Sequence, residues 1–259
     1  GDAALAMPRY LLTIEYDGGP FVGWQRQDNG LSVQEVMERA ADALEEGRHE
    51  VYGAGRTDSG VHALAMTAHV DFAKDWPEDV VRDALNHHLK PHPVAVLSAR
   101  RVSDEVHARF SAVKRGYVYR IIDRRAPLAL EAGRAWRVRV PLDADAMNKA
   151  AQHLVGTHDF TTFRDAQCQA DSPVKSLDAI SVARHGELIE LKVEAISFLH
   201  RQIRSITGSL VEVGRGRWSV DDFRDALEAA DRTRCGPVAP PEGLYLAFVR
   251  YPAGVAGNP

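Results

Sequence analysis

The order of apolar patterns in residues 9–102 constrains the fold more than any other feature of the sequence. Residues 9–16 alternate apolar and polar side chains, as a half-buried strand does. Ser32, with Glu35 three residues later, is typical of a helix N-terminus. Further strands are expected at 51–52, 66–72 and 94–102, and helices at 32–47 and 77–91. This β-α-β-β-α-β order predicts a ferredoxin-like unit.

The second half of the chain has a related layout but does not repeat the sequence. Its expected strands are 113–122, 135–140, 176–184, 188–195 and 244–251, and its expected helices are 143–156, 199–214 and 219–230. We therefore predict the α+β class, with two ferredoxin-like-related domains whose mainly antiparallel sheets are flanked by helices. The predicted domains are residues 7–105 and 106–259.

The segment from Gly53 to Ala63 is the candidate functional loop. Its glycines let backbone approach a ligand closely, and Arg56 and Asp58 supply one cation and one carboxylate. A P-loop is excluded because Val61-His62 stand where Lys-Ser/Thr is needed, and a dinucleotide fingerprint fails because Asp58 replaces its third glycine. Two interpretations remain: a reactive aspartate held beside an arginine, or a turn in which Asp58 caps backbone N–H groups.

Composition limits the class of protein. The 259 residues are 45% hydrophobic and 26% charged, which suits one large or two medium globular domains. No apolar run reaches the roughly 18 residues of a membrane span. Cys168 and Cys235 lack a zinc or C-x-x-C spacing, so we expect a cytoplasmic protein without metal or cofactor. Residues 1–6 lack the design of a signal peptide, and we expect the native start near Met7.

The charge is unevenly distributed along the chain. The net charge is −4, but residues 100–139 hold eleven Lys/Arg and four Asp/Glu, and residues 200–217 hold four and one. Such a local excess of cations predicts a basic face on an acidic body, and a face that binds RNA is one interpretation of it. A solvated strand surface is the alternative interpretation.

Several short motifs, spread along nearly the whole chain, together resemble the sequence of one protein family. They are Gly55-Arg56-Thr57-Asp58-Ser59-Gly60-Val61-His62, Gly23-Trp24-Gln25-Arg26-Gln27, His107-Ala108-Arg109-Phe110-Ser111-Ala112, Tyr117, Phe160-Thr161-Thr162-Phe163-Arg164, Gln167-Cys168-Gln169, Gly208-Ser209-Leu210 and Glu242-Gly243-Leu244-Tyr245-Leu246. Together they resemble the TruA-type tRNA pseudouridine synthases. The resemblance implies a two-domain, sheet-cored fold and a homodimer that isomerises uridines 38, 39 and 40 in tRNA anticodon stem-loops.

Three catalytic residues follow from this resemblance by position. Asp58 matches the catalytic aspartate, which acts near C1′ as nucleophile or as base; the sequence leaves that choice open. Tyr117 resembles the tyrosine that stacks on the target base. Arg204 resembles the arginine paired with the aspartate, which implies a catalytic cleft between the two domains. Arg201 is its rival, because the segment departs from the commoner form of this motif at Arg201 and Ser205.

The predicted RNA-binding residues are Arg56, Trp24, Arg26, His62, Arg109, Lys114, Arg115 and Arg201. The resemblance implies that Arg56 takes the place of the flipped nucleotide, with a simple phosphate contact as the alternative. For Trp24 and Arg26, a tryptophan in the core beside a solvated arginine is an equally good interpretation. His62 is expected to support the loop. Two other functions remain: a nucleoside or glycoside hydrolase, which would release free base, and a non-catalytic RNA-binding module.

Overall fold

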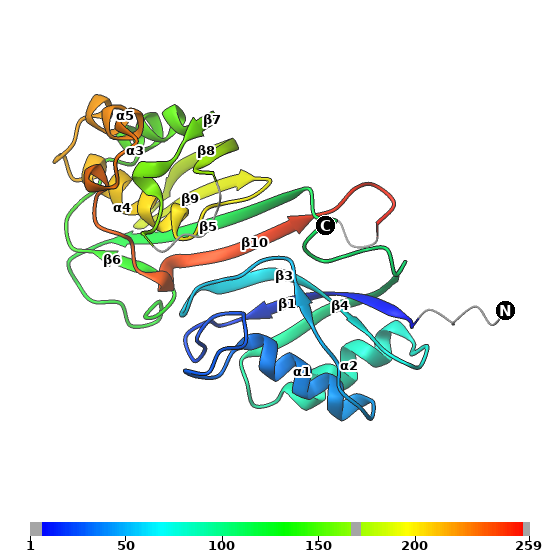
Figure 1. Ribbon diagram of the computed structural model, residues 1–259. Helices are drawn as coiled ribbons and strands as arrows, with labels where there is room; N and C mark the ends of the chain where they lie inside the picture. Colours follow the sequence, from blue (N-terminus) through cyan, green and yellow to red (C-terminus); the bar gives the residue numbers. More distant parts are fainter. Residues whose placement is uncertain (1–6, 167–171, 256–259) are drawn as a thin grey trace. The chain divides into compact units, whose positions relative to one another are not determined.

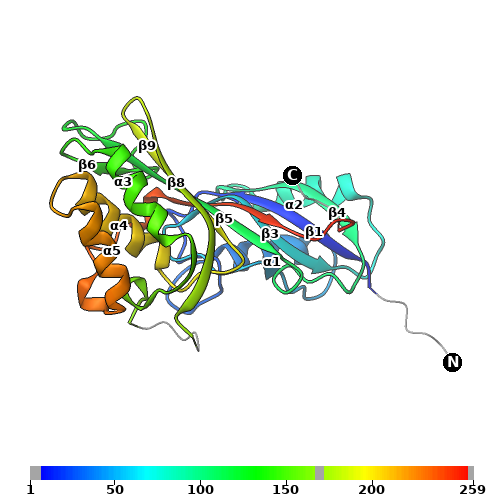
Figure 2. The same cartoon turned by 90° about the horizontal axis from the view of Figure 1, so that it is seen from above.

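The structure is a computed structural model that describes residues 7–166 and 172–255 (Figures 1 and 2). The motif Gln167-Cys168-Gln169 lies outside the described residues. The chain divides into two compact units: unit 1 holds the residues up to Arg115 and from Leu246 onward, and unit 2 holds Gly116–Tyr245. The chain passes between the units within β5 (Lys114–Asp123) and β10 (Leu244–Arg250). The predicted domains, 7–105 and 106–259, stay a prediction.

Unit 1 is built on a sheet with strand order β4-β1-β3, in which β2 also pairs with β3 and all these pairs are antiparallel. Its elements are β1 (Arg9–Tyr16), α1 (Val33–Leu44), β2 (Tyr52–Gly53), β3 (His62–Asp71), α2 (Glu78–Leu89) and β4 (Val94–Val102). The predicted β-α-β-β-α-β order is therefore present. In register, Leu12 of β1 lies opposite Ala68 of β3 and Ala99 of β4.

The two helices of unit 1 cover the same face of this sheet (Figure 1). The side chain of Ser32 accepts a hydrogen bond from Glu35 N at 3.1 Å, so the predicted N-cap of α1 is confirmed. The apolar stripe of α1 includes Val36 and Met37, and α2 buries Leu85. Burial of these side chains against the sheet forms the core that supports the loop between β2 and β3.

Unit 2 has the sheet order β5-β9-β8-β7, with β6 parallel to β5. Its other elements are β6 (Trp136–Val138), α3 (Ala144–Ala151), β7 (Gly156–Asp159), β8 (Val174–His185), β9 (Leu188–Ala195), α4 (Gln202–Gly214) and α5 (Val220–Ala229). The α+β class with mainly antiparallel pairing is confirmed. β7 was not predicted, because its residues Gly-Thr-His-Asp carry no apolar alternation. None of the helices in 7–166 and 172–255 has the length and hydropathy of a membrane-spanning segment.

Helix α4 is buried along its whole described length, with one exception. Twelve of its thirteen residues are buried, and Arg204 alone in this fully described helix is partly exposed. The helix was expected to start at 199 but begins at Gln202, because Arg201 has the left-handed φ of 58° and breaks the helical run. The side chain of Gln202 accepts a hydrogen bond from Leu199 N at 2.8 Å.

Candidate functional site

The loop that carries Asp58 connects β2 to β3 within unit 1. It leaves β2 through a hydrogen bond from Ala54 N to Thr67 O at 2.8 Å. A turn closed by Val61 N and Asp58 O at 3.0 Å returns the chain to β3. Asp58 is partly exposed, as a carboxylate that meets a substrate must be.

Thr57, the residue before Asp58, is held by two hydrogen bonds. Its carbonyl oxygen accepts from Trp24 N at 3.2 Å. Its Oγ1 lies 2.6 Å from the hydroxyl of Tyr16 at the end of β1. Backbone and side chain are therefore both fixed immediately before the carboxylate.

Two glycines outside the loop allow its backbone to approach closely. Gly23 has φ +98°, and a Cβ there would lie 2.4 Å from Thr57 O. A Cβ on Gly18 would lie 2.0 Å from Val61 O. Real Cβ atoms do not tolerate such distances, so the loop's position requires both glycines.

The structure buries two side chains that the sequence predicted as RNA contacts. Trp24 is 3% exposed, and its indole packs where a Cβ on Gly53 would lie 2.5 Å away. His62 is 1% exposed, and its Nδ1 accepts a hydrogen bond from Gly18 N at 2.8 Å. Since neither ring has surface left for RNA, both hold the loop, and the core alternative for Trp24 applies.

Arg26 and Arg56 differ in how their charge is used. The guanidinium of Arg26 pairs with Glu35 at 3.2 Å and Glu38 at 2.9 Å, and its hydrogen bond to Glu38 raises the pKa of Arg26. Two carboxylates thus offset its charge. The side chain of Arg56 is exposed beside Asp58 in sequence. A solvent-exposed cation there suits contact with RNA.

Arg115 connects the loop of Asp58 to the segment 107–111. Its Nε and one terminal nitrogen donate to Ala54 O at 3.2 and 2.6 Å, and the same terminal nitrogen donates to Arg109 O at 3.1 Å. These donors are directed at backbone rather than at a phosphate. Arg109 is exposed and Lys114 is half-buried, so both keep surface for RNA.

The predicted residues of unit 2 lie on β5 and at the start of α4. Tyr117 is half-buried, with its ring 5.3 Å from that of Phe198 in an edge-on arrangement. Tyr119, two residues along the strand, is fully buried and donates to Pro240 O at 2.6 Å, so it is the core aromatic of the two. Arg204 Nε donates to Ala239 O at 2.8 Å, whereas exposed Arg201 pairs with Asp165 at 3.5 Å.

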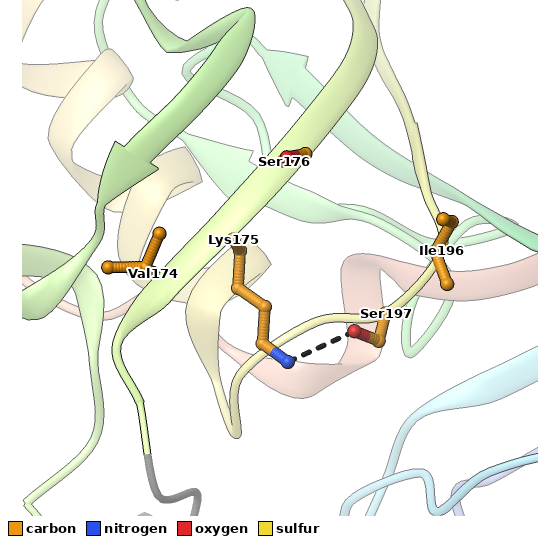
Figure 3. A pocket seen from close by; sticks show the side chains of 5 residues that line it. All are labelled: Val174, Lys175, Ser176, Ile196 and Ser197. Atoms are coloured by element: carbon orange, nitrogen blue, oxygen red, sulfur yellow. Dashed lines mark hydrogen bonds between the residues drawn. The ribbon is translucent and has the colours of Figure 1, made fainter.

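A shallow hollow of about 270 Å³ in unit 2 contains none of these residues (Figure 3). It lies between the start of β8 and the residues after β9. Lys175 Nζ donates to Ser197 Oγ across it at 3.0 Å. Within 7–166 and 172–255 there is no group of three or more His, Cys, Asp or Glu that could hold a metal ion.

A family model described as tRNA pseudouridine synthase matches residues 12–111 and 150–252. The tRNA pseudouridine synthase A of Maricaulis maris is 69% identical over 246 residues, which cover 95% of this chain and 99% of that relative. The chain belongs to the tRNA pseudouridine synthase family. The tRNA pseudouridine synthase A of Methylocella silvestris is 60% identical over 245 residues, 95% of this chain and 99% of that relative.

A solved structure is also similar to this member of the tRNA pseudouridine synthase family. It is titled "Crystal Structure of a Cbf5-Nop10-Gar1 Complex", and it matches at 13% identity and a TM-score of 0.32 over 87% of this chain and 60% of that chain.

Sequence reasoning missed two supports of the loop in this pseudouridine synthase family member. Tyr16 was expected only as a residue of the strand at 9–16, and neither it nor Gly18 was assigned to the site. The local signal was the tyrosine at the end of this strand face, and Tyr10 on the same face carries an identical hydroxyl, so the signal did not point to the loop. Thr57, the partner of Tyr16, lies 41 positions away, so no local pattern reveals the contact.

Proposed function

We propose that this chain isomerises uridine to pseudouridine in tRNA, with Asp58 as the reacting carboxylate. The observation that carries the proposal is the 69% identity to a tRNA pseudouridine synthase A along 95% of the chain. Asp58 lies in the motif that resembles the family's catalytic segment, and on a loop whose position is fixed from both sides. Such preorganisation is what a carboxylate needs to meet one reacting atom.

The reaction breaks the C1′–N1 bond, turns the uracil, and forms a C1′–C5 bond. C5 loses its proton and N1 gains one, so substrate and product have the same atoms and no oxidant, reductant or energy source is required. Asp58 would serve either as the nucleophile at C1′ or as the base that takes a C2′ proton. We expect no cofactor.

Other residues are assigned by their position in the family motifs. Tyr117 would stack on the target base, Arg204 would pair with Asp58, and exposed Arg56 would occupy the space left by the flipped nucleotide. Uridines 38, 39 and 40 of the anticodon stem-loop, a homodimeric enzyme and a cytoplasmic location complete the proposal. Light scattering tests the dimer by its mass.

The test is tritium release from tRNA labelled at C5 of uridine. The wild-type chain should release tritium, and release should survive EDTA. Asp58→Asn should abolish release but leave tRNA binding nearly unchanged, because an uncharged isostere removes the reactive group and few contacts. Free uracil in place of isomerised RNA would indicate a hydrolase. Normal release by Asp58→Asn would refute the role of Asp58.

A further inference from the structure

Four aromatic rings form a cluster within unit 1, in which Tyr52 lies near both His69 and His107. The ring of Tyr52 stacks on His69 with 4.9 Å between centroids, His69 meets His107 edge-on at 4.6 Å, and His107 lies 4.4 Å from Phe110. The inner ring of His69 is 1% exposed. Tyr52 is 43% exposed and Phe110 is 76% exposed. The cluster therefore supports the ring of Phe110 on one side and leaves it largely exposed.

The turn that carries Phe110 is held by hydrogen bonds. Nδ1 of His107 accepts from Arg109 N at 3.1 Å and from Phe110 N at 3.2 Å. The hydroxyl of Ser111 accepts from His107 N at 2.9 Å. Nδ1 of His69 accepts from Ala108 N at 3.0 Å. Phe110 is thus exposed on an ordered turn.

The same turn is tied to the loop of Asp58. Arg115 donates to Arg109 O and to Ala54 O, and Ala54 precedes Asp58 by four positions. A Cβ on Gly55 would lie 3.9 Å from Nε of Arg115, which shows how closely the guanidinium approaches this loop. One side chain therefore sets the spacing between the exposed ring and the loop.

We propose that Phe110 is a stacking site for an unpaired nucleobase of the substrate tRNA, and that Arg115 positions this site relative to Asp58. The inference rests on the proposed function. Base–aromatic stacking tolerates any base, because every base has a π face. A single ring is small beside the apolar patches that bind proteins.

The charge around Phe110 favours RNA as the occupant over a protein. The guanidinium carbon of Arg109 lies 5.5 Å from the centroid of the Phe110 ring, a cation–π distance. Arg109 and Arg56 are both exposed. A polyanion that stacks a base on the ring would meet the cation of Arg109, whereas an apolar protein surface would have to desolvate it.

The first test compares substitutions of Phe110 in the full chain. Phe110→Ala and Phe110→Leu should both raise the Kd for tRNA by about fivefold to about one hundredfold. Phe110→Trp should keep the wild-type Kd, because it restores a stacking ring. Leu97→Ala is the matched control: Leu97 is 48% exposed on β4 of the same unit, and its loss should leave the Kd unchanged.

The second test concerns Arg115. Arg115→Met should lower turnover at saturating tRNA by up to about 100-fold, because it frees the loop from the turn. Arg115→Lys should recover part of the rate, since its ammonium reaches one carbonyl. Equal rates for both variants and the wild type would overturn the positioning role.

The outcomes separate this inference from the proposed function. An unchanged Kd of Phe110→Ala for tRNA overturns the stacking site. If the mass in light scattering also changes in this variant, the ring belongs to a protein interface. Tritium release by the wild type with an unchanged Kd for Phe110→Ala refutes the inference alone. A weakened Phe110→Ala complex without release by the wild type refutes the proposed function alone.

Discussion

The hydroxyl of Tyr16 lies 2.6 Å from Oγ1 of Thr57, and both residues are buried. Thr57 directly precedes Asp58 in the chain. The contact joins the last residue of β1 to the loop between β2 and β3. A carboxylate on a glycine-containing loop therefore takes its position from a strand of the sheet.

Tyr16→Phe should lower turnover, although it should destabilise the fold no more than a matched substitution on the same strand does. Loss of the hydroxyl leaves Thr57 without this partner in a buried place, at a cost of about 1 to 3 kcal/mol in the free energy of unfolding. Tyr10→Phe is the control, because Tyr10 on the same strand is buried and donates to Trp76 O at 2.5 Å. Urea unfolding should show similar losses for both, and tritium release should fall only for Tyr16→Phe. Equal loss of activity would contradict a local role for Tyr16.

Gly23→Ala should be far more damaging than Gly47→Ala. Both glycines have positive φ, +98° and +110°, so both alanines suffer the same kind of backbone strain, about 1 kcal/mol. A Cβ at Gly23 would also lie 2.4 Å from Thr57 O, whereas a Cβ at Gly47 meets no atom within 4 Å. We expect Gly23→Ala to lower both the midpoint of thermal unfolding and turnover, and Gly47→Ala to lower only the midpoint. Two variants with equal turnover would show that the close approach is dispensable.

Because of His69, the free energy of unfolding should decrease as the pH is lowered from about 6.5 to about 4. Burial, with smaller contributions from Arg9 and His107, lowers the pKa of His69 from 6.5 to about 4. Below pH 6.5 the unfolded chain binds this proton and the folded chain does not, so the unfolded state gains up to about 3 kcal/mol by pH 4. Urea unfolding at several pH values in this range gives the free energy of unfolding as a function of pH. That free energy should depend less on pH for His69→Gln, which keeps an acceptor for Ala108 N. An unchanged pH dependence of the free energy of unfolding would exclude His69 as its source.

Arg204→Met should cost far more turnover than Arg201→Met. Arg204 is the partly exposed residue of a helix that is otherwise buried, and its Nε is anchored on Ala239 O, whereas Arg201 pairs with Asp165. In the pair proposed above, the planar guanidinium of Arg204 would hold and orient the carboxylate of Asp58, so its loss should lower the rate. Arg204→Lys should be more active than Arg204→Met, because it restores the charge without the planar fork. An inactive Arg201→Met beside an active Arg204→Met would show that Arg201 is the arginine required for turnover.

The sequence predicted the elements well where local patterns decide them. Alternation identified β1, and Ser32 identified the start of α1. It placed the start of β3 at 66 rather than His62, because the first residues of β3 pair with the end of β1 and owe their strand conformation to that partner. β7 and the left-handed Arg201 also depend on neighbours that no local pattern shows.

For the site, the motifs suggested RNA contacts for some side chains that the structure uses to support the loop of Asp58. The predicted RNA contacts included Trp24, His62 and Arg115, which lie in or near the motifs. A core position for Trp24 and support of the loop by His62 were the alternatives. The structure buries the first two and directs hydrogen bonds from Arg115 to backbone carbonyls. A residue type gives its chemical capacity, but burial and partners decide how that capacity is used.

By itself the sequence determined the α+β class, the β-α-β-β-α-β order of unit 1 and the motif that contains Asp58, because these depend on residue spacing and short-range periodicity. Only the tertiary structure decided what holds Asp58 and what stands exposed beside it. The contacts that do so join Tyr16 to Thr57 over 41 positions and Arg115 to Ala54 over 61. Contacts over such separations form when strands pair and a core closes, so no local stretch of sequence specifies them.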